Sequence, residues 1–133
     1  LHSDEKIIDI LSLRTVAVIG MSKHSSKAAH YVPKYLIDHG YDITPVNPTA
    51  DKILDIRCYD SVSEINGPID IIDVFRPSDQ IASIIHDCIK KRPKVIWLQE
   101  GIHDFESEEL ARKSGITVIF NRCMLAEHRR LLA

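Results

Sequence analysis

Short apolar runs alternate along this chain with longer segments in which apolar residues recur at helical spacing. The runs are rich in β-branched residues and lie at about 15–19, 41–46, 69–75, 94–98 and 116–120. Continuous apolar runs of this length are typical of strands that are buried on both faces of a parallel sheet. The pattern therefore predicts about five strands in the interior of the fold.

The segments between these runs predict helices, because their apolar residues fall on one helix face. They lie at about 3–12, 29–39, 77–89, 106–114 and 124–132, and a short capped turn is expected at 59–64. Pro33 has no amide hydrogen and fits without strain only in a first turn, so the second helix should begin near Ala29 or His30. Strands that alternate with helices predict right-handed crossovers, and hence an α/β fold with a doubly wound parallel sheet in a single domain, 1–133.

Composition narrows the class of protein without naming a function. The chain has 133 residues, of which 44% are hydrophobic and 27% charged, and its formal net charge is −2. This size fits one domain with an ordinary core, and the charge balance argues against general binding of nucleic acid. No apolar run reaches membrane-spanning length and no secretory signal is recognisable, so we expect a cytoplasmic protein that does not bind a membrane.

The cysteines and histidines do not form a recognisable metal motif. Cys58, Cys88 and Cys123 are far apart and contain no C-x-x-C pair, which argues against a zinc site or a redox dithiol. His24 and His30 are the one close histidine pair, and their spacing does not place them on one helix face. We therefore expect no metal site and reduced, mostly packed cysteines.

The end of the first apolar run carries the strongest chemical signal. The run stops at Gly20, where the backbone can turn tightly, and Ser22, Lys23, Ser25 and Lys27 follow before a helix begins. A strand, a small polar loop and a helix N-terminus together are the parts of an anion site. The two lysines suit a ligand with more phosphate charge than a dinucleotide, for example a pyrophosphate and a separate phosphate.

A nicotinamide dinucleotide fits this loop poorly. Gly20-Met21-Ser22 lacks the second glycine of the G-x-G-x-x-G fingerprint. The second run ends in Val46-Asn47-Pro48, where a dinucleotide site would place an acidic residue for the ribose hydroxyls. Asn47 can accept a ribose hydrogen bond, but it does not supply the charge.

In a doubly wound sheet the ligand binds outside the carboxyl ends of the strands, so the residues after each run are the candidates. Phe75-Arg76-Pro77 follows the third run, Gln99-Glu100-Gly101 the fourth and Asn121-Arg122-Cys123 the fifth. Polar, amide and guanidinium groups are concentrated in these segments, whereas the strands themselves are apolar.

A set of short motifs occurs in order along the chain: V-A-V-I-G-M-S at 16–22, H-G-Y at 39–41, P-V-N-P at 45–48, D-V-F-R-P at 73–77, W-L-Q-E-G at 97–101, and N-R-C-M at 121–124 with E-H at 127–128. In these motifs the chain resembles the small stand-alone CoA-binding protein family, which is similar to the CoA-binding N-terminal domain of the succinyl-CoA synthetase alpha subunit. The resemblance runs nearly end to end, and its specificity lies in the combination of motifs. It implies a Rossmann-like domain that binds coenzyme A.

The resemblance assigns the contacts of coenzyme A by position. It implies that the first loop binds the phosphates and that the P-V-N-P turn flanks the adenosine. The D-V-F-R-P segment would form the next wall, and the last two strand ends would lie near the pantetheine side. In chain order these residues are Gly20, Met21, Ser22, Lys23, Ser25, Lys27, Val46, Asn47, Pro48, Phe75, Arg76, Pro77, Gln99, Gly101, Asn121 and Arg122.

The expected function is binding of CoA or an acyl-CoA as a small-molecule ligand, without evident catalysis. The alternative is a small enzyme, either a thiol or acyl transferase that uses Cys123 or a nicotinamide-dependent reductase. Cys123 precedes Glu127 and His128, but no third group that would orient a nucleophile is recognisable. A mixed disulfide of Cys123 with a ligand thiol is also chemically reasonable. A third alternative is a regulatory protein that senses CoA, although the sequence identifies no protein partner.

Overall fold

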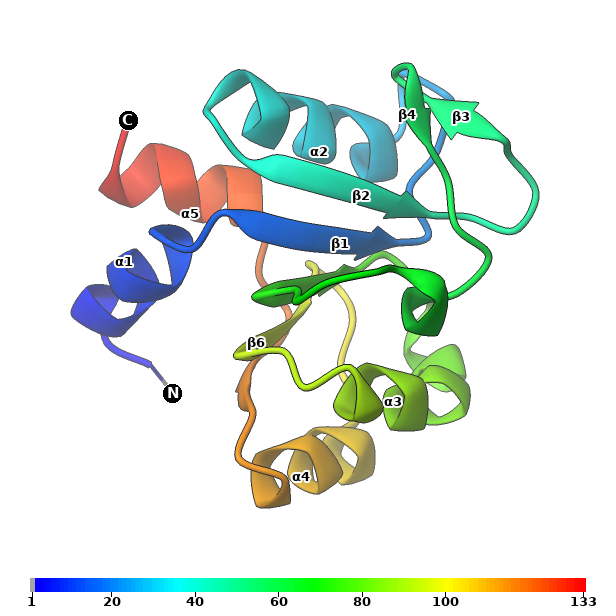
Figure 1. The fold of residues 1–133 in the computed structure, drawn as a ribbon. Coiled ribbons are helices and arrows are strands. Elements are labelled where there is room, and N and C mark those ends of the chain that lie inside the picture. The colour runs from blue at the N-terminus through cyan, green and yellow to red at the C-terminus, as the bar shows by residue number, and fades with distance from the viewer. Residues whose placement is uncertain (1) are drawn as a thin grey trace.

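The computed structural model describes residues 2–133 and has a five-stranded parallel sheet at its centre (Figure 1). The strands are β1 (Thr15–Ile19), β2 (Asp42–Val46), β5 (Ile71–Val74), β6 (Val95–Leu98) and β7 (Thr117–Ile119). Their order across the sheet is β2-β1-β5-β6-β7, and each neighbouring pair is parallel. The predicted α/β fold with a doubly wound sheet of about five strands is confirmed.

Helices cover both faces of this sheet (Figure 1). One face carries α1 (Asp4–Leu11), α2 (Ala28–Asp38) and α5 (Met124–Leu131), and the other carries α3 (Ile81–Lys90) and α4 (Phe105–Lys113). The helix that was expected from position 77 begins as a 3-10 helix, η2 (Ser78–Gln80), and continues as α3. Among residues 2–133, no helix combines the length and the apolar character that crossing a membrane requires.

Alternation along β5 divides the interior into two hydrophobic clusters. Ile71 packs with α1, α2 and α5, whereas Ile72 and Val74 pack with α3 and α4. The chain winds outward in opposite directions from β1 and β5, so these neighbours form the switch point of the sheet. The carboxyl ends of β1 and β5 are therefore where a ligand is expected.

Helix α2 differs from the prediction, because it begins at Ala28 and Pro33 is its sixth residue rather than part of its first turn. Pro33 has no amide hydrogen, so the carbonyl of Ala29, four residues earlier, lacks its usual helical partner. The amide of Ser22 donates to this carbonyl instead, at 3.0 Å. A hydrogen bond from the preceding loop therefore compensates for the proline, and the local sequence pattern does not reveal such a bond.

The crossover from β2 to β5 contains no α-helix, in agreement with the short capped turn expected at 59–64, but it also contains a β-hairpin that was not expected. The elements of the crossover are β3 (Lys52–Ile53), β4 (Ile56–Arg57) and the 3-10 helix η1 (Val62–Glu64). Leu54 and Asp55 turn the β3–β4 hairpin with φ of 52° and 62°, without the glycine that usually marks such a turn. The expected capped turn is present, since Ser61 and Glu64 form a capping box.

Helix α5 is fixed to α2 by a cluster of aromatic rings. The Tyr35 hydroxyl and Nδ1 of His128 share a hydrogen bond of 2.7 Å, and the ring of His39 stacks on Tyr35 at 3.9 Å between centroids. The pKa of His128 is lowered mainly by burial, and to a smaller extent by the nearby His39 and Arg14. The neutral ring is therefore favoured. The cluster fixes the position of α5, whose N-terminus lies at the carboxyl end of the sheet.

Candidate functional site

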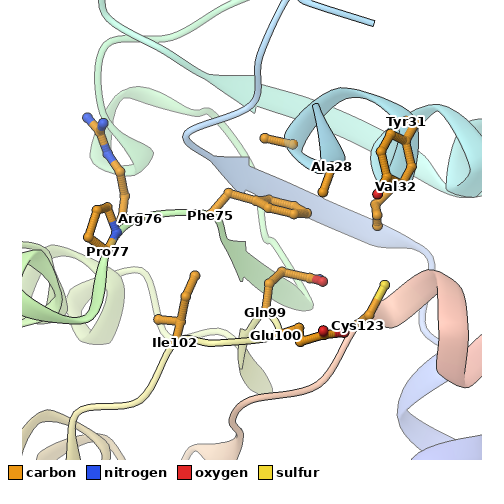
Figure 2. A pocket seen from close by; sticks show the side chains of 11 residues that line it. Ala28, Tyr31, Val32, Phe75, Arg76, Pro77, Gln99, Glu100, Ile102 and Cys123 are labelled. Carbon is orange, nitrogen blue, oxygen red and sulfur yellow. The ribbon is translucent and has the colours of Figure 1, made fainter. Parts of the chain in front are cut away.

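Two adjoining cavities open at the carboxyl ends of the strands. The apolar cavity, of about 410 Å³, is lined by Ala28, Ala29, Tyr31, Val32, Phe75, Arg76, Pro77, Gln99, Glu100, Ile102 and Cys123 (Figure 2). The cationic cavity, of about 330 Å³, is lined by Gly20, Met21, Ser22, Lys27, Ala29, Asn47, Pro48, Thr49, Phe75 and Arg76. Ala29, Phe75 and Arg76 border both cavities. One elongated ligand can therefore extend from one cavity into the other.

Gly20 lets the loop after β1 approach the loop after β5. It has a φ of +83°, and a Cβ atom on this residue would lie 2.5 Å from the carbonyl oxygen of Phe75. The same atom would come within 3.3 Å of Cδ of Arg76. Glycine is the residue that fits here, and the close approach brings the Arg76 side chain beside the loop.

Hydrogen bonds within the protein fix the shape of the loop after β1. The amide of Ser22 donates to the carbonyl of Ala29, and the carbonyl of Ser22 accepts from Nδ1–H of His30 at 2.7 Å. Nδ2 of Asn47 donates to the carbonyl of Met21 at 2.9 Å, which joins the P-V-N-P turn to this loop. Ser22 and Asn47 therefore shape the site with backbone and amide groups that are already engaged.

The cationic cavity carries positive charge without acidic partners. Lys27 and Arg76 line it, and Lys23 lies in the exposed part of the same loop. In the part of the chain that the structure describes, none of these three side chains forms an ion pair. The N-cap of α2, Lys27, makes no side-chain hydrogen bond to the helix, and the first turn contains no acidic residue. The positive end of the α2 dipole is therefore left uncompensated beside this cavity.

Most of the residues that the resemblance assigns come together at these cavities. The cationic cavity contains Gly20, Met21, Ser22, Lys27, Asn47 and Pro48, the apolar cavity Pro77 and Gln99, and both contain Phe75 and Arg76. Val46 instead lines a third cavity of about 100 Å³, beside Pro48 and Arg76. The assigned residues that line none of these three cavities are Lys23, Ser25, Gly101, Asn121 and Arg122.

The loops after β6 and β7 are joined to each other and to α5. The amide of Gly101 donates to Oδ1 of Asn121 at 2.8 Å, and Asn121 has a φ of 54°. Nη1 of Arg122 donates to a carboxylate oxygen of Glu127 at 3.3 Å, and the carbonyl of Arg122 accepts from the indole N–H of Trp97 at 2.8 Å. A direct contact of Gly101, Asn121 or Arg122 with a ligand stays a prediction.

Sequence reasoning missed the wall that α2 and the start of α5 contribute. Tyr31 and Val32 on α2, Ile102 after β6 and Cys123 before α5 all line the apolar cavity. Val32 lies one helical turn after Ala28, so helical periodicity from the correct start of α2 is the signal that would have found it. The sequence suggested Cys123 as a nucleophile, and the structure places its side chain at the cavity wall opposite α2 (Figure 2).

His30 and His128, which are close in sequence to residues that line these cavities, use their rings in hydrogen bonds within the protein. The ring of His30 bonds to Ser22 and that of His128 to Tyr35, and no hydrogen bond joins Cys123 to a histidine within residues 2–133. In the same range, no three metal-ligating side chains form a group that could hold an ion. What the cavities present is positive charge at one end and an apolar wall at the other, which suits an anionic ligand with an extended apolar part.

A buried carboxyl lies behind the wall of the apolar cavity. Asp73 is 0% exposed on β5, and its Oδ1 accepts a hydrogen bond of 2.5 Å from Nε2 of Gln99, which lines the cavity. Burial raises the pKa of Asp73 to about 7, although the bond from Gln99 acts in the opposite direction. The carboxyl can therefore change its charge near neutral pH.

Several known proteins are similar to this chain along most of its length. The model of the CoA binding domain family matches residues 14–129. An uncharacterized protein of Bacillus subtilis, YneT, is 36% identical over 115 residues, which are 86% of this chain and 85% of that protein. The solved structure of a hypothetical protein from Pyrococcus horikoshii has a TM-score of 0.96 at 37% identity, and the match covers 99% of this chain and 94% of that one.

A larger enzyme shares only this segment. The ADP-forming acetate–CoA ligase of Methanocaldococcus jannaschii is 31% identical to 84% of this chain. The match covers 17% of the ligase. The chain therefore corresponds to a small part of that enzyme and to nearly all of the stand-alone relatives.

Proposed function

This chain belongs to the CoA binding domain family, and we propose that it binds coenzyme A or an acyl-CoA across its two adjoining cavities. The phosphates occupy the cationic cavity, and the pantetheine arm extends into the apolar cavity. The match to the ligase covers a small segment of that enzyme, so the proposal concerns binding and not ligation.

The observation that carries this proposal is the unpaired positive charge around the cationic cavity. Lys27 and Arg76 border it without acidic partners among residues 2–133, and the uncapped N-terminus of α2 adds backbone N–H groups. Coenzyme A carries a pyrophosphate and a 3′-phosphate, which are strong hydrogen-bond acceptors. Charge-assisted hydrogen bonds contribute about 1.5–3 kcal/mol each, against about 1 kcal/mol for a neutral pair. A ligand with several phosphates therefore gains more here than a neutral metabolite.

The apolar cavity supports the same proposal through its shape and lining. It meets the cationic cavity at Phe75 and Arg76 and reaches Cys123, with Tyr31 and Val32 as an apolar wall on α2 (Figure 2). Pantetheine is a narrow arm with apolar stretches, two amides and a terminal thiol. An arm that enters at Phe75 carries its thiol or acyl group toward Cys123.

The adenosine has a place beside the P-V-N-P turn. Val46 and Pro48 line the third cavity together with Val62 and Ile84, which supply apolar surface next to Arg76. Asp60, Ser61 and Asp87 line the same cavity and supply polar groups. The side-chain amide of Asn47 is engaged, because Nδ2 donates to Met21 and Oδ1 accepts from Thr49. We therefore expect Asn47 to hold the turn in place rather than to bind the ribose.

Calorimetric titration with a panel of ligands tests the proposal. We expect coenzyme A to bind, dephospho-CoA to bind at least about tenfold more weakly because it lacks one phosphate, and NAD and NADP to bind weakest. Saturation by NAD or NADP with no heat from coenzyme A would overturn the proposal. Equal affinity for coenzyme A and dephospho-CoA would remove the role of the 3′-phosphate and leave the rest.

A thiol or acyl transferase that uses Cys123 is the second candidate, and it is favoured by the position of Cys123 at the end of the apolar cavity. Acyl transfer between acyl-CoA and a second thiol distinguishes the two functions. If Cys123→Ser abolishes turnover and keeps affinity for coenzyme A, the enzyme is supported. If the wild type gives no turnover, the binding protein is supported.

A further inference from the structure

The carboxyl of Asp73 is the least satisfied polar group in the described interior. Its side chain is 0% exposed, and Oδ1 accepts one hydrogen bond, from Gln99. Oδ2 has no hydrogen-bond partner. Every other buried side-chain nitrogen or oxygen within residues 2–133 has one. Burying a polar atom without a partner lowers the stability of the folded protein. A carboxylate oxygen in this state on the central strand is therefore a candidate for a functional role.

Gln99 connects this carboxyl to the wall of the apolar cavity. It is 3% exposed and lines the cavity, and its two amide atoms point to different elements. Nε2 donates to Asp73 at 2.5 Å on β5, whereas Oε1 accepts from the amide of Met124 at 3.3 Å, the first residue of α5. Met124 follows Cys123, which also lines the cavity. A change at Asp73 therefore reaches two wall residues, Gln99 directly and Cys123 through the start of α5.

The surroundings of Asp73 are apolar. Its neighbours in register are Val18 on β1 and Trp97 on β6, and by alternation it faces the same side of the sheet as Ile71. Most titratable groups of the helices on this side are exposed or have a partner. On α2 they are His30 (bonded to Ser22), Tyr31 (exposed), Lys34 (paired with Asp38) and Tyr35 (bonded to His128). Before and on α5 they are Cys123, Glu127 (bonded to Arg122 and Arg130), His128 and the exposed Arg129, and on α1 the exposed Asp4, Glu5, Lys6 and Asp9.

None of these groups forms a hydrogen bond or an ion pair with the Asp73 carboxyl in the described chain. The two causes that shift its pKa are burial, which raises it to about 7, and the weaker opposing bond from Gln99. The stability of the ionised form therefore depends on how polar its surroundings are, and Gln99, which bonds to Asp73, also lines the apolar cavity.

We propose that Asp73 and Gln99 are positioning residues of the apolar cavity, and that filling this cavity with the pantetheine arm is coupled to uptake of a proton by Asp73. The inference depends on the proposed function, because it requires coenzyme A in that cavity. Asp73 is fully buried, so solvent in the cavity stabilises its ionised form only at a distance, across Gln99, and a ligand in the cavity replaces that solvent by less polar atoms. The ionised carboxyl then becomes still less favourable, so the pKa of Asp73 rises further in the complex.

Linkage gives the sign of the effect on affinity. Below the pKa of the free protein, Asp73 is protonated in both states and affinity does not depend on this group. Between the pKa values of the free protein and the complex, the complex holds more protons, so affinity falls as pH rises. If the ligand raises the pKa by about one unit, affinity drops about tenfold in total.

The single tryptophan provides a direct readout in the wild type. Trp97 is the one tryptophan of the chain and lies beside Asp73 in register. We expect its fluorescence to titrate with a midpoint near the pKa of Asp73, and coenzyme A to move this midpoint upward by about one unit. A midpoint that stays in place while coenzyme A saturates the protein overturns the inference.

Asp73→Asn isolates the carboxyl, since an amide oxygen can still accept the bond from Gln99. We expect this variant to lose the Trp97 transition and the fall of affinity above about pH 7, so that only the pH dependence of the ligand's own phosphate remains. Asp70→Asn is the matched control, because Asp70 lies just before the same strand, pairs with Lys94 at 3.6 Å on the partly exposed edge, and should keep the wild-type profile.

The outcomes separate this inference from the proposed function. No binding of coenzyme A at any pH rejects the function itself. Binding with the same pH profile in the wild type and Asp73→Asn rejects only the inference. If Asp73→Asn does not fold, the wild-type fluorescence titration with and without coenzyme A decides alone. Titration of the ligand's own phosphate is common to both proteins, so it cancels in the comparison.

Discussion

The amide of Ser22 donates a hydrogen bond of 3.0 Å to the carbonyl of Ala29, at the place where a proline leaves that carbonyl without its helical partner. The bond joins the loop after β1 to the first turn of α2. The loop that borders the cationic cavity is thereby fixed by a feature of the helix that follows it. A residue that weakens the helix locally thus helps to order the site.

Replacing this proline tests the relationship. Pro33→Ala supplies an amide that competes with Ser22 for the carbonyl of Ala29. We expect the free energy of unfolding to rise by about 1–3 kcal/mol, because proline is unfavourable inside a helix, and the hydrogen-exchange protection of the Ser22 amide to fall. Pro68→Ala, in an exposed loop, is the control and should leave Ser22 protected. Unchanged protection of Ser22 in Pro33→Ala would show that the bond does not depend on the proline.

Gly20→Ala should damage the site through a steric clash. The new Cβ would lie 2.5 Å from the carbonyl oxygen of Phe75, on a residue whose φ is +83°. We expect the free energy of unfolding, measured by chemical denaturation, to fall by about 3 kcal/mol or more. Gly40→Ala is a matched control, because Gly40 has a φ of +89° but no atom within 4 Å of the new Cβ. This variant should lose only about 1–2 kcal/mol, the cost of the left-handed backbone conformation for a residue with a Cβ atom. Equal losses of stability in both variants would contradict the close contact between Gly20 and the Phe75 carbonyl.

The cationic cavity should lose affinity when its charges are removed. We expect Lys27→Met and Arg76→Met each to weaken binding of coenzyme A by about tenfold or more, because each removes a charge-assisted bond from a phosphate. Lys34→Met is the control, since Lys34 lies on the exposed side of α2 and pairs with Asp38 at 2.9 Å. Calorimetry at two salt concentrations should show a weaker salt dependence for the two cavity variants. A loss of similar size in Lys34→Met would assign the effect to net charge.

Labelling of the three cysteines should report the occupied cavity. Cys123 lines the apolar cavity, Cys58 is partly exposed elsewhere, and Cys88 is buried with a pKa that burial raises to about 12. With a maleimide and mass spectrometry, we expect acetyl-CoA, which has no free thiol to consume the reagent, to slow the labelling of Cys123 at least about fivefold while that of Cys58 is unchanged. Cys88 should stay unlabelled with and without ligand. Equal labelling of Cys123 in both states would place the pantetheine arm outside the apolar cavity.

The stability of the ligand-free protein should depend on pH through Asp73. The pKa of this group is 3.8 in the unfolded reference and about 7 in the folded protein, so the folded state binds the proton more tightly between these values. The contribution to stability is therefore complete below about pH 4 and is lost as pH rises to about 7, by about 1.4 kcal/mol per unit. Asp73→Asn should remove this slope. Denaturant unfolding at several pH values, compared between the two proteins, measures the difference.

The main elements of the fold could be predicted because their signals are local. The run from Val16 to Ile19 is apolar on both faces, and such a strand requires a sheet that is covered on both sides. The capping box of Ser61 and Glu64 lies within four residues and formed as expected. The β3–β4 hairpin escaped prediction because its two strands are only two residues long and Leu54 and Asp55 adopt positive φ without the glycine that usually marks such a turn.

The site could be predicted in part for the same reason. Gly20, Lys27 and Arg76 follow strand ends, and in a doubly wound sheet such positions converge whatever the remaining sequence is. Tyr31 lies on α2 and Cys123 lies directly before α5, and the orientation of these helices toward the sheet determines which residues reach the cavity. That orientation depends on packing, including the bond between Tyr35 and His128 across 93 positions of the chain.

By itself the sequence determined the order along the chain of the five sheet strands and the five α-helices, the loop at Gly20 and the edge of the sheet where the two cavities lie, because periodicity and turn chemistry depend on neighbours along the chain. Only the tertiary structure decided that Ser22 takes the carbonyl that Pro33 leaves open, and that Asp73 is paired with Gln99, 26 positions away. These relationships join residues that no local pattern connects. Their energies arise from burial and hydrogen bonding between segments, and these exist only once the sheet has formed.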